Sequence, residues 1–208
     1  MLYPFKDVER RFNAGYNEVY EFPRYNIRPT QKMPIVVQHD GKNELVMAQW
    51  GLTPAWMKGK VLFNTRDESV ATKPFFNSLF KKYRCLIPAD GFYEWQHIDG
   101  KKQPYRITLK SDPIFGFAGI YEMNKEKKLL QFSIITTEPN ALVAKIHNRM
   151  PVIIPKESEN KYINEESDAD DLLKYLKPYP ASQMESYPVS TLVNSSKNDG
   201  ADVIKPLK

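Results

Sequence analysis

The sequence is poor in the residues that build disulfides and metal centres. Cys85 is the single cysteine among 208 residues, and the three histidines, His39, His97 and His147, stand far apart. A disulfide within the chain needs two cysteines, and zinc sites need ligands at a close, regular spacing. We therefore expect no internal disulfide, no metal site and no cofactor. Cys85 lies in an apolar run, where we expect a buried hydrophobic residue.

The sequence also lacks a long hydrophobic run. No stretch approaches the roughly 18 consecutive apolar residues that cross a bilayer. The first residues, MLYPFKDVERRF, place charges where a secretory signal would have its apolar stretch. We therefore expect a cytoplasmic protein that has no membrane partner.

Neither sign of charge is scarce, because 30 Lys and Arg stand against 25 Asp and Glu, a formal net charge of +5. This excess favours a polyanionic partner only mildly. Hydrophobic residues make up 41% of the chain and charged residues 26%, which is typical of a folded globular protein. The length fits a single domain over residues 1–208, since domains usually contain roughly 100–200 residues.

Proline is abundant, with 16 residues against the roughly 5% of an average protein, so long helices are disfavoured. The spacing of apolar residues predicts a short amphipathic helix over residues 3–14. A proline at the start and lysines at the end predict another helix over 74–83. We expect a short helix near 140–146 and one or two surface helices over 156–177.

Strand-like runs alternate with turns along most of the chain. The runs at 34–38 and 44–50 are joined by a segment that contains Asp40 and Gly41, which predicts a hairpin. We expect these runs and those that follow to form one extended antiparallel sheet or an open barrel. The later runs cover residues 84–88, 91–95, 105–109, 114–121, 131–136, 152–154 and 187–193.

Two residues are candidates for proton transfer. Glu94 lies between Tyr93 and Trp95, so its carboxylate would lose solvation and its pKa would rise toward the range that suits a general acid or base. His147 titrates near neutral pH by nature. The structural alternatives are a solvated strand glutamate and a hydrogen-bonded structural histidine.

Two arginines and two tryptophans are candidates for nucleic-acid contacts. Arg66 and Arg149 carry the bidentate fork that suits phosphate. Trp50 and Trp56 flank a loop with Gly and Pro, where an indole could stack on a base. Both tryptophans could equally fill the core.

Seven motifs together resemble one family, the SOS response-associated peptidases or SRAP proteins. The resemblance extends from about residue 25 to 194. The motifs are YNIRPTQ at 25–31, WGLTPAW at 50–56, NTR at 64–66, RCLIPADGFYEW at 84–95, IITTE at 134–138, HNRMP at 147–151 and PVS with Asn194 at 188–194.

The resemblance implies an α+β fold with a mainly antiparallel, barrel-like core and peripheral helices. It also implies a partner, single-stranded DNA that contains abasic sites, to which a monomeric protein crosslinks through an N-terminal cysteine as a thiazolidine. By motif, Asn64 would position the N-terminal residue, Glu94 would act as general acid or base at the sugar, and His147 would assist Schiff-base chemistry. The implied DNA contacts are Arg66, Arg149, Trp50, Trp56, Pro29 and Thr30.

The start of the sequence departs from the family pattern. The family begins Met-Cys-Gly-Arg and then has a short strand, whereas this sequence opens Met1-Leu2-Tyr3 and reaches its first predicted helix almost at once. Either the gene start lies upstream or the chain is a variant without the thiol. The completeness of the other motifs favours the first explanation.

Three functions therefore compete. The leading one is an abasic-site crosslinking protein with an associated peptidase activity that removes its own initiator Met. The second is a non-catalytic single-stranded DNA-binding variant that lacks the nucleophile. The third is a cysteine hydrolase built from Cys85, His147 and Glu94, which would need an exposed Cys85 thiol within hydrogen-bond reach of His147.

Overall fold

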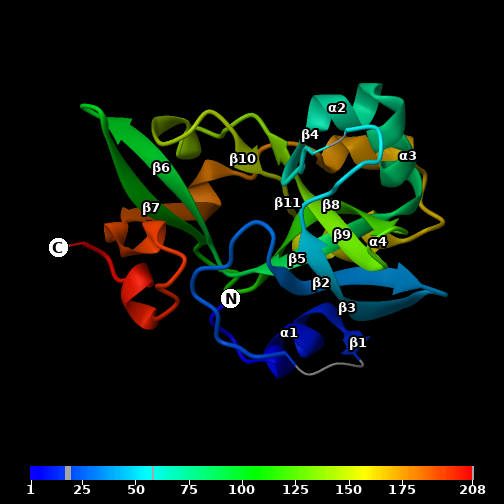
Figure 1. The fold of residues 1–208 in the computed structure, drawn as a ribbon, viewed down its shortest axis with the longest axis horizontal. Helices are drawn as coiled ribbons and strands as arrows, with labels where there is room; N and C mark the ends of the chain where they lie inside the picture. The colour runs from blue at the N-terminus through cyan, green and yellow to red at the C-terminus, as the bar shows by residue number, and fades with distance from the viewer. Residues whose placement is uncertain (17–19, 58, 208) are drawn as a thin grey trace.

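The computed structural model describes residues 1–16, 20–57 and 59–207, which form two β-sheets and several short helices (Figure 1). One sheet has nine strands and the other has three. Among the described residues, no helix is long and apolar enough to cross a membrane.

Five strands of the larger sheet close into a barrel, as the resemblance implied. They follow the order β3-β2-β5-β8-β9, and a parallel pairing of β9 with β3, at Gln49–Gln131 and Trp50–Phe132, closes the ring. The short strands β1 (Ala14–Tyr16), β4 (Asn64–Arg66), β10 (Met150–Pro151) and β11 (Ile153–Ile154) pair with these. The barrel strands are β2 (Lys32–His39), β3 (Lys42–Trp50), β5 (Arg84–Ala89), β8 (Phe115–Asn124) and β9 (Leu129–Thr137).

The predicted hairpin is present as β2 and β3. Its register places His39 opposite Lys42, so Asp40 and Gly41 alone form the turn. Their φ angles are 48° and 73°, which is the left-handed conformation that a two-residue type I′ turn requires and that Asp-Gly accommodates. The hairpin prediction is confirmed.

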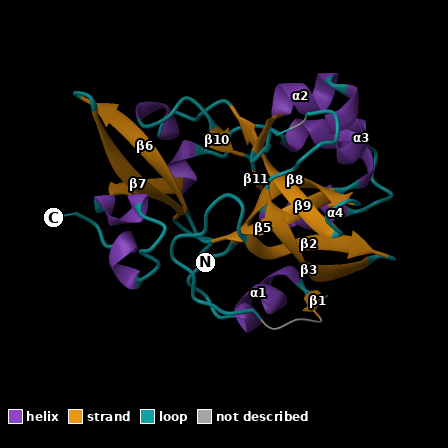
Figure 2. Ribbon diagram, in the orientation of Figure 1, coloured by secondary structure: helices purple, strands orange, loops and turns teal. Residues whose placement is uncertain are grey.

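The second sheet corrects the expectation of one extended sheet. It contains β6 (Phe92–Ile98), β7 (Lys101–Leu109) and β12 (Met184–Pro188), and it stands beside the barrel (Figure 2). The last strand also ends earlier than expected. The Ser190 side chain accepts a hydrogen bond from the N–H of Leu192 and so caps a 3₁₀ helix over Thr191–Asn194.

The helices agree with the sequence expectations in position more than in length. The predicted N-terminal and middle helices are α1 (Phe5–Phe12) and α3 (Pro74–Lys82). The segment 140–146 contains only the 3₁₀ helix Val143–Lys145. A helix that the sequence analysis did not anticipate, α2 (Asp67–Thr72), directly follows β4. The segment 156–177 forms α4 (Glu159–Ile163), α5 (Ala169–Leu172) and short 3₁₀ turns.

Four of the five barrel strands, β2, β5, β8 and β9, contain runs of consecutive buried residues, so both of their faces are covered along those runs. Along β2, Ile35 and Val37 belong to one cluster of buried side chains and Val36 belongs to another. The second cluster continues into the apolar faces of α1 and α3, so these helices cover one face of the barrel wall. The first cluster reaches the mouth of the barrel, where Met33 lines a cavity.

Candidate functional site

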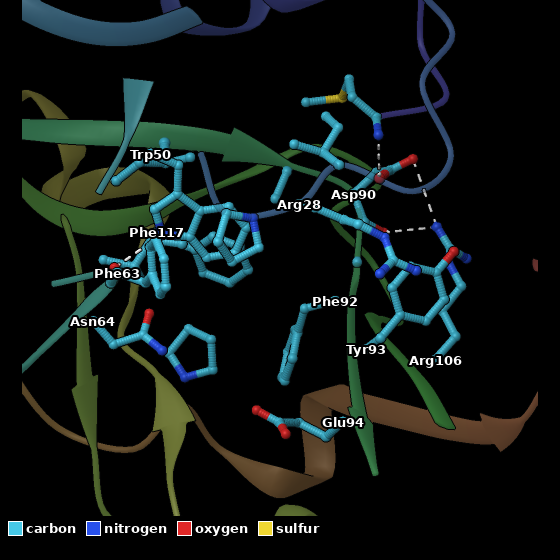
Figure 3. Close-up of a pocket in the computed structure, with 18 of the residues that line it drawn as sticks. Arg28, Trp50, Phe63, Asn64, Asp90, Phe92, Tyr93, Glu94, Arg106 and Phe117 are labelled. Carbon is cyan, nitrogen blue, oxygen red and sulfur yellow. Dashed lines mark hydrogen bonds and ion pairs between the residues drawn. The ribbon is translucent and has the colours of Figure 1, made fainter. Parts of the chain in front are cut away.

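A cavity of about 590 Å³ lies where the barrel meets the three-stranded sheet (Figure 3). Its wall is built from segments far apart in sequence, which the closure of the barrel brings together. These segments are residues 25–29, β4, the end of β5 with the start of β6, and residues 147–151. Asn64, Glu94 and His147, the three residues that the motifs indicated for catalysis, all line it.

Glu94 and His147 face each other across this cavity although 53 residues separate them. The Oε2 atom of Glu94 lies 3.8 Å from Nδ1 of His147. The same ring nitrogen lies 3.2 Å from the backbone nitrogen of Arg149 and 3.1 Å from its carbonyl oxygen, so the Arg149 backbone orients the ring. The arrangement places a carboxyl group and an imidazole where both could act on one ligand.

The environment of Glu94 raises its pKa to about 7. Burial is the main cause, because only 21% of the side chain is exposed, and the positive charge of protonated His147 opposes it. The neighbours on the strand are themselves fixed. The Tyr93 hydroxyl donates to the Tyr25 carbonyl at 2.8 Å, and the Trp95 indole donates to the side chain of Asn194 at 2.7 Å. At neutral pH, Glu94 is therefore poised between its acidic and basic forms.

Asn64 opens β4, which pairs in parallel with β9. Figure 3 shows its carboxamide and the Glu94 carboxylate projecting toward the same space. The Asn64 side chain is exposed, and among the described residues no hydrogen bond engages it. It is therefore free to contact a ligand in the cavity.

The two candidate arginines differ sharply in their surroundings. Arg66 is exposed, lines the cavity and has no ion pair within the described residues. Arg149 also lines the cavity, but its guanidinium donates to Asp67 and Glu68 at 2.8 Å each and to the Thr136 carbonyl. This pairing lowers the pKa of Glu68 to about 2. Arg66, rather than Arg149, thus presents the unneutralised charge.

The two candidate tryptophans also differ in their position relative to the cavity. Trp50 lines the cavity, and its indole donates to the Phe63 carbonyl at 2.8 Å. Trp56 is 62% exposed, packs edge-on against Phe75 and lies outside the cavity wall. Pro29 lines the cavity, whereas Thr30 is exposed and is not part of the cavity wall. The structure therefore does not bring Trp56 and Thr30 to the site.

A family model described as SOS response associated peptidase (SRAP) matches residues 2–196. The chain belongs to the SRAP family. It is 41% identical to the abasic site processing protein YoqW of Bacillus subtilis, with 97% of this chain and 95% of that protein covered. It is 30% identical to the abasic site processing protein YedK of Escherichia coli, with 88% and 85% covered. A crystal structure of a protein from Bacteroides thetaiotaomicron matches with a TM-score of 0.76 at 31% identity, with 86% and 82% covered.

The SRAP site contains a buried charge network that the sequence analysis missed. Asp90, at the end of the motif's strand, accepts the Leu2 N–H at 2.8 Å and lies 3.5 Å from the Met1 amine and from Arg106. Burial lowers the pKa of that amine. Asp90 belongs to the motif at 84–95, which could have marked it as a candidate site residue. No motif or spacing in the sequence indicated Arg106. Arg28, Phe63 and Phe92 also line the cavity without having been predicted.

Cys85 takes no part in the site. Its side chain is fully buried among the apolar residues of the barrel, it does not line the cavity, and burial raises the pKa of its thiol well above the ordinary value. A thiolate nucleophile needs the opposite environment. The cysteine hydrolase hypothesis is therefore wrong. Among the described residues, no cluster of His, Cys, Asp and Glu could hold a metal ion.

Proposed function

We propose that this SRAP protein recognises abasic sites in single-stranded DNA as a monomer and links covalently to the ring-opened sugar. The observation that carries the proposal is the pair of Glu94 and His147, 3.8 Å apart in a cavity where Glu94 has a pKa of about 7. The printed names of the relatives, abasic site processing proteins, support the choice of substrate.

The chemistry begins on the closed sugar. An abasic deoxyribose is a hemiacetal, and it opens when the C1′–O4′ bond breaks. Glu94 in its protonated form gives its proton to O4′, while His147 in its neutral form accepts the proton of the C1′ hydroxyl. The products are a C1′ aldehyde and a free O4′ hydroxyl. Glu94 has lost one proton and His147 has gained one.

The covalent step uses the α-amine of the N-terminal residue. The amine nitrogen attacks the C1′ aldehyde, and loss of water from the resulting carbinolamine gives an imine. The departing hydroxyl takes a proton from His147, which ring opening has left protonated, and the nitrogen gives up its remaining proton to the ionised Glu94. In the SRAP pattern, the thiol of an N-terminal cysteine adds to the imine carbon and its proton moves to nitrogen, which yields a thiazolidine. Asn64 would hold the N-terminal residue beside the sugar.

The DNA contacts follow the distribution of charge at the site. Arg66 would bind a phosphate beside the lesion, and Trp50 and Pro29 would line the path of the strand. Arg149 would contribute once a phosphate replaces one of its carboxylate partners, Asp67 or Glu68. The associated peptidase activity would use the same two proton-transfer groups, with water as the nucleophile on the bond after an initiator Met.

A second function is favoured by one observation, the exposed Arg66 at the cavity, which has no ion pair within the described residues and could bind a phosphate without a covalent step. A non-catalytic protein would keep the cavity and Arg66 and would bind single-stranded DNA without a covalent product.

One experiment separates the two functions. The 208-residue chain, and a version with Cys placed directly after an initiator Met ahead of Leu2, are incubated with a single-stranded oligonucleotide that has one abasic site. We expect the first to give a product only after borohydride reduction and the second to give a product that survives denaturation. His147→Ala should slow both, whereas the control His39→Ala, an exposed histidine, should not. Binding without any product in either chain would support the non-catalytic function.

A further inference from the structure

The segment that follows β12 packs over the loop that lines the cavity. Val189, Val193 and Val203 form a small buried cluster against Tyr25, Tyr93 and Trp95. Figure 1 shows this C-terminal segment in red beside the three-stranded sheet. The segment therefore contacts the cavity loop and the strand that carries Glu94, and Ile204 itself lines the cavity.

Asp199 makes the most concentrated polar contact between the segment and the loop. Its Oδ1 atom accepts the backbone N–H groups of Tyr25 at 2.6 Å and Asn26 at 2.7 Å. Its Oδ2 atom accepts the guanidinium of Arg24. These bonds to the ionised carboxylate lower the pKa of Asp199. One side chain thus holds the backbone of two consecutive residues and the side chain of the residue before them.

Asn26 ties the loop to the same segment from the other side. Its side chain is buried and its Nδ2 atom donates to three carbonyl oxygens, those of Val193 and Ser195 at 3.1 Å and of Asn198 at 2.9 Å. The Arg28 guanidinium donates to the Val193 carbonyl as well. Residues 193–199 thus hold the loop at four residues between positions 24 and 28, and Met1, Trp50 and Tyr93 add further hydrogen bonds to it.

We propose that Asp199 is a positioning residue, which fixes the backbone of Tyr25 and Asn26 and thereby the cavity wall from Tyr25 to Pro29. The residues matched by the SRAP family model end at 196, so Asp199 lies beyond them. The consequence for DNA rests on the proposed function. The effect of Asp199 on the loop is independent of the proposed function, because it concerns hydrogen bonds within the chain.

The test compares three variants. Asp199→Ala removes all three accepted hydrogen bonds. Asp199→Asn retains one acceptor oxygen, which can serve the N–H groups of Tyr25 and Asn26, and loses the pairing with Arg24. Asp202→Ala is the matched control, since it removes an equal charge from the same segment at an exposed residue whose ion pair within the described residues is with Lys205.

Two readouts are measured on each variant. The first is amide hydrogen exchange over residues 25–31, without DNA. The second is the rate at which borohydride-trapped product forms as a function of the concentration of abasic DNA, which separates the half-saturating concentration from the maximal rate. We expect Asp199→Ala to speed amide exchange at Tyr25 and Asn26 at least tenfold and to raise the half-saturating concentration about tenfold with little change in maximal rate. Asp199→Asn should show smaller changes in both readouts than Asp199→Ala, and Asp202→Ala should match the unaltered chain.

The outcomes distinguish the inference from the function on which it partly rests. Unchanged exchange over 25–31 in Asp199→Ala overturns the positioning role, whatever the DNA result. Faster amide exchange with an unchanged half-saturating DNA concentration would mean that Asp199 only stabilises the loop locally. That result would also overturn the positioning role. If the unaltered chain gives no product, the proposed function fails, while the exchange data still decide whether Asp199 holds the loop. Should Asp199→Ala not fold, Asp199→Asn carries the same comparison.

Discussion

Replacing Glu94 by Gln is expected to make the protein more stable and less active at the same time. The substitution keeps the size of the side chain and removes its titration. Glu94 is mostly buried beside His147, and its pKa of about 7 stands well above the ordinary 4.5. At pH 8 the folded protein must therefore hold an ionised carboxylate in an environment that disfavours charge.

The size of the stability effect follows from the two pKa values. Between pH 4.5 and 7 the folded state holds a proton on Glu94 that the unfolded state has released, so the free energy of unfolding falls as the pH rises through this window. At 1.36 kcal/mol for each pKa unit, the difference amounts to at most about 3 kcal/mol above pH 7, and less because the side chain is partly exposed. Gln does not titrate, so the free energy of unfolding of Glu94→Gln should exceed that of the unaltered chain by about 1–3 kcal/mol at pH 8 and by close to nothing at pH 4.

The activity should move in the opposite direction. Loss of a general acid or base typically slows a reaction by about 10²–10⁴-fold. Because the proposed function makes protonated Glu94 the acid in ring opening, the rate for the unaltered chain should decline as the pH rises through about 7. The rate for Glu94→Gln should lack that decline.

The assay pairs urea unfolding at pH 4, 6 and 8 with the rate of borohydride-trapped product on abasic single-stranded DNA at the same pH values. Glu126→Gln, in the exposed turn between β8 and β9, controls for the change in net charge. A stability difference between Glu94→Gln and the unaltered chain that stays constant from pH 4 to pH 8 would refute the raised pKa. A gain in stability without loss of rate would refute the catalytic role alone.

Three further predictions rest on separate parts of the structure. Arg66→Ala should weaken binding of single-stranded DNA and lower the salt slope of log K by about 0.7, measured by fluorescence anisotropy, whereas Lys125→Ala should do neither. Cys85 should resist a thiol reagent in the native protein and react after unfolding in guanidinium; rapid native labelling would contradict its burial. Gly119→Ala should destabilise the chain by about 1–3 kcal/mol in urea unfolding, because its Cβ would lie 2.9 Å from the Cys85 Sγ and 2.3 Å from an isoleucine methyl, whereas Gly200→Ala meets no atom within 4 Å and should be tolerated.

The sequence alone determined several of the local elements and the family. Apolar spacing was enough to place α1, because a helix that covers a barrel must bury one face and Phe5, Val8 and Phe12 lie on it. Asp40 and Gly41 were enough to place the β2–β3 turn, because few other residues accept its backbone angles. The order of the motifs was enough to indicate the SRAP family, which the family model confirms.

The strand pairings depended on the tertiary structure. Residues 91–95 and 105–109 read as strands, but periodicity does not say which strand pairs with which. The barrel closes through β3 and β9, which leaves the β6–β7 hairpin to pair with β12 in a separate sheet. This division creates the cavity, because Glu94 then faces the barrel mouth from the neighbouring sheet.

The electrostatic character of the site was also decided only by the tertiary structure. Arg66 and Arg149 look equivalent in the sequence, yet Asp67 and Glu68 engage only Arg149. Likewise, the flanking aromatic residues predicted that the pKa of Glu94 rises, but its value depends on burial and on the distance to His147. Charge interactions and desolvation depend on separations of a few ångströms between distant segments. Local sequence patterns specify backbone conformation and the faces that must be buried, and those separations are fixed only when the segments pack.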